Sequence, residues 1–146
     1  MRRLPKMLNA GCLGLLLTAL GAAGCTSEAT ESVLPPATVR TLMRGKTVPA
    51  ANVLFAVADQ APADPAGWRE VERSALALAE VGARLQNGTR GAGRAQWAGY
   101  SQAMADGARR AARAAGQADA EAVSVAGNDV YAACEACHKA FFKKTP

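Results

Sequence analysis

Residues 134–138, close to the C-terminal end of this 146-residue chain, read Cys-Glu-Ala-Cys-His. On an α-helix, positions three and four apart are neighbours, so Cys134, Cys137 and His138 would share one face. Apolar or small residues keep the same spacing before and after them: Val123, Gly127, Val130, Cys134, Cys137 and Phe141. The sequence therefore predicts a long last helix, from about 119 to 143, with this CxxCH motif on its core-facing stripe.

The CxxCH motif is typical of covalent haem attachment. Each thiol can add to one vinyl group of a single porphyrin, and the imidazole of His138 can bind the iron as an axial ligand. A structural zinc site would need four ligands, and the chain has one histidine and only two other cysteines, both near the N-terminus. A thioredoxin-like pair would follow a strand, which these flanks do not predict. A plain disulfide between Cys134 and Cys137, in a helical interaction protein without a cofactor, stays open.

Residues 1–24 have the pattern of an export signal, with a basic start followed by an apolar stretch from about 7 to 23. The end of this segment, Leu-Gly-Ala-Ala-Gly before Cys25, resembles a bacterial lipoprotein cleavage box. We therefore expect lipidation of Cys25, a membrane anchor and a periplasmic location. The alternative is an ordinary cleavable signal that releases a soluble product.

The mature chain would consist of a tether, residues 25–36, and one domain, residues 37–146. The tether is polar and ends in two prolines. Removal of residues 1–24 takes away Arg2, Arg3 and Lys6 but no acid, which lowers the formal net charge from +5 to +2. The basic balance therefore belongs mostly to the leader, and it predicts neither nucleic acid nor a general acidic partner.

About a quarter of the chain is alanine, the best helix former, and the domain shows four helical segments with no strand pattern. Asp64 and Asp119 are suited to cap the second and fourth segments, and Pro49 predicts a kink or split of the first near Gly45–Val48. Short connections predict an all-α, antiparallel four-helix bundle. The predicted segments are 37–58, 65–86, 94–116 and 119–143.

A single CxxCH motif near the C-terminus, on the last helix of an alanine-rich four-helix chain, resembles the class II c-type cytochromes, the family of cytochrome c′. The tail His-Lys-Ala-Phe-Phe-Lys at 138–143 is similar to that family's motif. The resemblance implies one covalently bound haem c, held by Cys134 and Cys137 with His138 as proximal iron ligand. It also implies a homodimer through the first two helices, as is frequent among relatives.

The distal ligand separates two functions of such a protein. In an antiparallel bundle Met43, about 9 Å from the start of the first helix, lies level with His138, about 8 Å from the end of the last. Low-spin members of the family take a methionine from this region, whereas five-coordinate members have an apolar distal face. Met43 could equally be core filler with Leu42 pointing inward, and Met104 is a rival deeper in the third segment.

We therefore expect an exported single-haem electron carrier with His138 and Met43 as iron ligands and with redox proteins as its partners. The alternative is a five-coordinate protein that binds nitric oxide or carbon monoxide. No acid–base pair or nucleophile arrangement predicts an enzyme. The glycine-rich segment 88–93 follows a helix rather than a strand, so it does not predict a nucleotide site.

Overall fold

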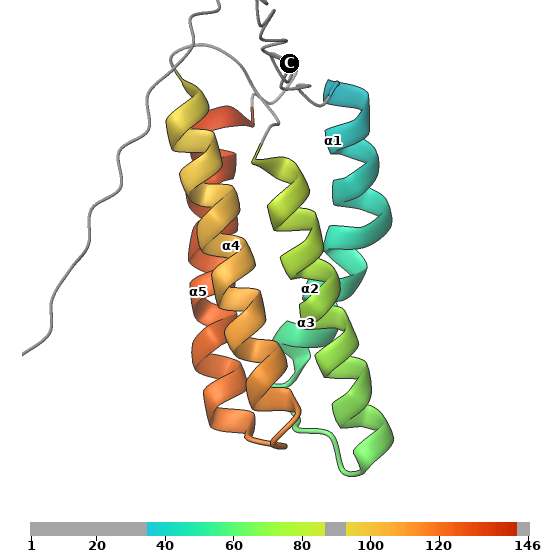
Figure 1. Ribbon diagram of the computed structural model, residues 1–146. Coiled ribbons are helices and arrows are strands. Elements are labelled where there is room, and N and C mark those ends of the chain that lie inside the picture. The colour runs from blue at the N-terminus through green and yellow to red at the C-terminus, as the bar shows by residue number, and fades with distance from the viewer. Residues whose placement is uncertain (1–34, 87–92, 143–146) are drawn as a thin grey trace, which may run out of the picture. The chain divides into compact units, whose positions relative to one another are not determined.

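The computed structural model describes residues 35–86 and 93–142, and every regular element within these two ranges is helical. Four helical stretches lie alongside one another, an arrangement compatible with a four-helix bundle (Figure 1). The first stretch consists of three consecutive segments, and the other three are single helices. In chain order the segments are α1 (Pro36–Leu42), the π-helical turn η1 (Met43–Thr47), α2 (Val48–Ala56), α3 (Pro65–Leu85), α4 (Arg94–Ala115) and α5 (Ala120–Phe141).

Both predicted helix caps are confirmed. The side chain of Asp64 accepts a hydrogen bond of 2.8 Å from the backbone N–H of Gly67, and Pro65 occupies the first turn of α3. The side chain of Asp119 accepts one of 2.9 Å from the N–H of Ala122 at the start of α5. Each carboxylate thus satisfies a backbone donor that has no partner within its own helix.

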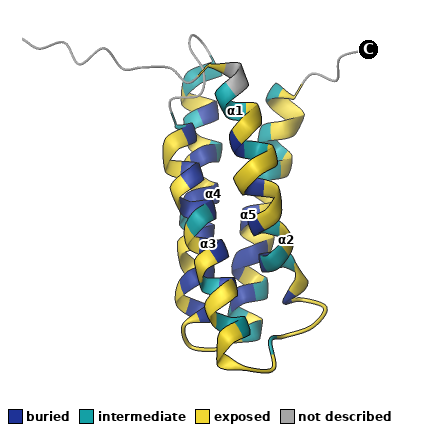
Figure 2. Ribbon diagram, turned by 90° about the vertical axis from the view of Figure 1, so that its right-hand side faces the viewer, coloured by how far each residue is buried: buried dark blue, intermediate teal, exposed yellow. Residues whose placement is uncertain are grey.

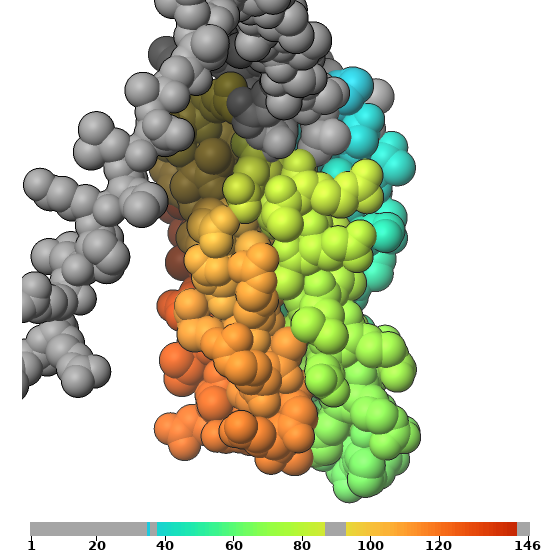
Figure 3. All heavy atoms as spheres, in the orientation of Figure 1, coloured from blue at the N-terminus to red at the C-terminus, as the bar shows by residue number. Residues whose placement is uncertain are grey.

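The core lies between the helices, where buried residues of each helix face the others (Figure 2). The apolar stripe of α3 is buried from Val71 to Leu85, whereas Trp68 at the start of this helix is only partly buried. Small residues let α3 and α4 approach closely, and their atoms meet along their length (Figure 3). The indole N–H of Trp97 donates to the carbonyl of Leu85, which ties the two helices together near one end.

The first stretch is irregular close to Gly45–Val48, where a kink or split was expected, but the irregularity is of another kind. The chain stays helical through the proline, and the irregularity is a π-helical turn just before it, Met43–Thr47. The backbone N–H of Val48 donates to the carbonyl of Met43, five residues earlier. Because Pro49 has no N–H, the regular bonding pattern is interrupted here in any case, and the wider turn accommodates the interruption without ending the helix.

Helix α5 packs against α4 and, toward its N-terminal half, against α2. Gly127 faces Leu54 and Phe55, and the ring of Phe55 lies 6.0 Å from that of Tyr131 in an edge-on contact. Among the described residues, α1 makes no comparable contact with α5, and the two stand apart at the upper end of the view (Figure 1). The CxxCH motif lies in the half of α5 that α1 leaves uncovered.

Candidate functional site

The core-facing stripe of α5 loses burial as it approaches the CxxCH motif. Val123 and Val130 are fully buried, and Gly127 is buried between them. Cys134, Cys137 and Phe141 continue the stripe at helical spacing, yet all three are only partly buried. The apolar stripe is therefore less covered toward the C-terminal end of α5.

Cys134 and Cys137 are free thiols that pack against the edge of the core. Burial raises the pKa of the Cys134 thiol. Burial, and secondarily the neighbouring Cys134, raise the pKa of Cys137 to about 11. Both groups are therefore neutral thiols near pH 7, the form in which they are compatible with partly apolar surroundings.

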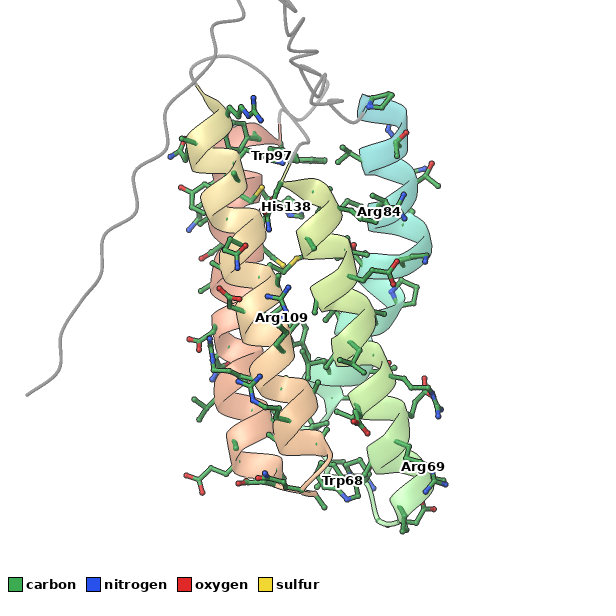
Figure 4. All side chains as sticks on the ribbon, in the orientation of Figure 1. Trp68, Arg69, Arg84, Trp97, Arg109 and His138 are labelled. Atoms are coloured by element: carbon green, nitrogen blue, oxygen red, sulfur yellow. The ribbon has the colours of Figure 1, made fainter. Side chains whose placement is uncertain are left out.

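An open surface cavity of about 450 Å³ lies along α5, lined, among the described residues, only by those of this helix and by Phe142 just after it. Of the stripe residues of α5, Cys134 lines this cavity, whereas Cys137 and Phe141 do not. Cys134 and the exposed side chain of His138 both contribute to it, and Figure 4 shows His138 in the same half of the protein as Trp97. The lining residues occupy one helical face and the position just after it: Tyr131, Cys134, Glu135, His138, Lys139 and Phe142.

The aromatic residues around the motif divide into two groups. Phe141 belongs to the core, because its ring lies 5.1 Å from that of Trp97 and 6.5 Å from that of Tyr100. Tyr131 and Phe142 instead line the cavity, and they are 58% and 66% exposed. Two large aromatic side chains thus stay largely in contact with solvent on the same surface as Cys134 and His138.

No role was predicted from the sequence for Glu135, which lies inside the CxxCH motif, or for Lys139, which follows it. Their side chains form an ion pair of 2.9 Å across the cavity-lining face. The signal was present in the sequence, since a glutamate four residues before a lysine is the favourable helical order. Both groups are well exposed, so the pair contributes little stability, and it balances the local charge beside His138.

Met43 is the first residue of η1, partly buried and in contact with the core. It does not line the cavity beside His138. Its neighbour Leu42 is only 5% exposed and Met104 only 4%, so both are core residues. The structure does not bring Met43 and His138 into contact, and its role as ligand stays a prediction.

Cys25 and the predicted signal and tether, except for its last two residues, lie outside the described residues. Within 35–86 and 93–142, no group of three or more histidine, cysteine or carboxylate side chains is arranged to hold a metal ion. A haem site does not require such a group, because its thiols bind the porphyrin edge and only the imidazole binds the metal. In the same ranges no helix has the length and apolar character needed to cross a membrane.

Comparison of the chain with protein-family models, with curated proteins and with solved structures found no match.

Proposed function

We propose that this protein is an exported c-type cytochrome of one haem, built as an antiparallel four-helix bundle, that carries single electrons between redox proteins. Cys134 and Cys137 would hold the haem through thioether bonds, and His138 would be the proximal iron ligand. Met43 would be the distal ligand. When bound, the haem supplies the one-electron couple, while the chain fixes the ligands and limits access of water.

The observation that supports this proposal most directly is the position of the CxxCH motif. It lies where the apolar stripe of α5 becomes partly exposed, beside a cavity and on the side that α1 leaves open. A motif of purely structural cysteines would gain nothing from an uncovered apolar face. A flat apolar group bonded to Cys134 and Cys137 would cover it.

Covering the exposed aromatic side chains with a bound apolar group would be favourable in free energy. Aromatic side chains bury roughly 150–250 Å² each, so covering the exposed parts of Tyr131 and Phe142 would remove on the order of 200 Å² from water. At about 25 cal/mol per Å², this burial is worth about 5 kcal/mol. Burial of these two side chains would therefore stabilise the binding of a large apolar group at this surface.

The register between the first stretch and α5 supports Met43 as the distal ligand. A Cβ placed on Gly127 would lie 3.9 Å from Leu54 and 3.7 Å from Phe55, so these positions are level. His138 comes eleven residues after Gly127, and Met43 comes eleven residues before Leu54. In an antiparallel pair of helices, these two steps run in the same direction along the bundle. The two predicted ligands would then lie at about the same height in the bundle.

The N-terminal part of the proposal depends on the sequence alone. Lipidation of Cys25 would hold the domain at the periplasmic side of a membrane, with residues 25–36 as the tether. Labelling of the full-length chain with a radioactive fatty acid tests the anchor, and a Cys25→Ala variant is its control.

Two measurements test the haem proposal. The protein is expressed with its own leader in a bacterium that matures c-type cytochromes, and haem is stained after denaturing electrophoresis. The wild-type chain should retain the stain, and a variant with Cys134→Ala and Cys137→Ala should lose it. A wild-type polypeptide with the mass of its amino acids alone and no colour would contradict the proposal.

The second measurement is the spectrum of the purified holo-protein in both oxidation states. A methionine–iron charge-transfer band in the near infrared of the oxidised protein is expected. It should disappear in Met43→Leu and persist in Met104→Leu, which makes a similar change in the core of α4.

One observation favours a second candidate function, the binding of nitric oxide or carbon monoxide at a five-coordinate iron. Among the described side chains of α1 and η1, Leu42 is the most buried, whereas Met43 does not line the cavity. An apolar residue opposite His138 would leave the sixth position open. A high-spin spectrum of the wild type, with fast carbon monoxide binding after reduction, would favour this candidate over the electron carrier.

A further inference from the structure

The buried residues of the first helical stretch change their spacing at η1. Counting back from Val57, the next buried positions are Leu54, Ala50 and Thr47, at the intervals of three and four expected for an α-helix. The next buried residue before Thr47 is Leu42, five positions away. The apolar stripe is therefore out of phase by one residue across the turn.

The π-helical turn is the cause of this shift. The N–H of Val48 donates to the carbonyl of Met43, and the hydroxyl of Thr47 donates to the carbonyl of Leu42 at 3.2 Å, so both bonds span five residues. Thr47 is only 6% exposed, which shields its hydrogen bond from water. One extra residue in a turn rotates the preceding segment by about 100° relative to the segment that follows.

This rotation determines where Met43 lies. In an uninterrupted α-helix, Met43 would fall on the stripe four residues before Thr47, and Arg40 would follow it toward the core. Instead Leu42 occupies the stripe, Arg40 is exposed, and Met43 is partly buried one position beyond the stripe.

The side of the helix to which Met43 is moved can be identified from α2. Phe55 comes one position after the stripe residue Leu54, as Met43 comes one position after Leu42. The ring of Phe55 contacts Tyr131 of α5. The flank that Met43 shares with Phe55 is therefore the flank that faces α5, the helix with the CxxCH motif.

We propose that Thr47, through the π-helical turn it anchors, is a positioning residue. It directs Met43 toward α5 and the haem that Cys134 and Cys137 would hold. This inference rests on the proposed function, because it gives a purpose to Met43 as distal ligand. Thr47 itself contacts no cofactor in this proposal; it acts by fixing the register of the helix that presents the ligand.

Insertion of one alanine after Gly45 is the most direct test. Gly45 is exposed, and a Cβ built on it would meet no atom within 4 Å, so an added residue meets little obstruction there. The insertion places Met43 five residues before Thr47, the position that Leu42 has in the wild type, and should turn Met43 onto the stripe. The holo-protein should keep its covalent haem by staining but lose the methionine–iron band. Insertion of one alanine after Ala61, an exposed residue between α2 and α3, is the matched control and should retain the band.

A pair of substitutions gives a second, milder test. Thr47→Val keeps the shape of the side chain but removes the hydroxyl, and it should weaken or shift the methionine–iron band. Thr47→Ser restores a hydroxyl and should restore the band. A crystal structure of the variant with the alanine inserted after Gly45 should show Met43, rather than Leu42, against the core.

The outcomes separate this inference from the proposed function. A band that persists unchanged in the variant with the alanine inserted after Gly45 and in Thr47→Val overturns the positioning role, while haem ligation by Met43 stands. Where the insertion variant does not fold, equal bands in Thr47→Val and Thr47→Ser overturn it alone. A stained wild-type protein without any methionine–iron band refutes ligation by Met43, and the positioning role with it.

Discussion

The close approach of α3 and α4 leads to a quantitative prediction for Gly82→Ala. A Cβ at Gly82 would lie 2.8 Å from the carbonyl oxygen of Ser101 and 2.9 Å and 3.0 Å from the Cβ and N of Ala105. Two of these three atoms belong to the backbone, so they cannot rotate away, and the helices must separate. Over-packing of a core typically costs about 1–3 kcal/mol, and this contact falls at the upper end.

Helix propensity opposes part of this cost. Alanine in the interior of a helix is more favourable than glycine by about 1 kcal/mol, so the net loss of stability should be about 2 kcal/mol. Gly99→Ala is the matched control, because Gly99 is exposed on α4 and no atom lies within 4 Å of its added Cβ. This control should gain up to about 1 kcal/mol from propensity alone.

Urea unfolding of the purified holo-proteins, followed by far-ultraviolet circular dichroism, measures both effects. With a slope of about 1–2 kcal/mol per M, the midpoint of Gly82→Ala should fall by about 1–2 M, and that of Gly99→Ala should rise. If Gly82→Ala proved as stable as Gly99→Ala, α3 and α4 would not pack as closely as described.

Two substitutions and one alkylation experiment probe the start of α5 and the Cys137 thiol. Asp119→Ala removes the side-chain cap on the N–H of Ala122 and should lower the free energy of unfolding by about 1 kcal/mol in the same urea assay; an unchanged midpoint would argue against the cap. Ala118→Gly should raise it by about 1 kcal/mol, because Ala118 has a φ of 54°, which glycine adopts without strain; a lower midpoint would contradict this. In a haem-free chain, alkylation of Cys137 should stay slow near pH 9 and increase toward about 11, since burial and then Cys134 raise its pKa. Half-maximal alkylation at pH 9.0 would refute the raised pKa. Because the folded state holds the thiol proton more tightly than the unfolded state, the neutral thiol's contribution to stability is complete below pH 9.0 and is lost as the pH rises toward 11.

Much of the secondary structure could be predicted because its causes are local. The stripe of α3 and the carboxylate caps at Asp64 and Asp119 depend only on residues within a few positions of one another. The same holds for the shared helical face of Cys134, Cys137 and His138. Haem attachment at these residues, and ligation by Met43, remain predictions from the sequence.

The first stretch shows where local reasoning was insufficient. Pro49 indicated that the regular helix is interrupted, but it did not reveal whether the chain would kink, split or widen. The π-helical turn is stabilised by the buried hydroxyl of Thr47 bonding to Leu42, and that burial depends on packing against α3. A threonine in a helix gives no such signal by its identity alone.

The sequence by itself determined the helices, their caps and the placement of two thiols and an imidazole on one face of the last helix, because these follow from periodicity and side-chain type. Only the tertiary structure decided that the apolar face around Cys134 and His138 stays partly uncovered, and that Leu42 rather than Met43 faces the core. Both outcomes depend on how separate helices meet. A shift of one residue in one turn changes which side chain is buried without changing the amino-acid pattern.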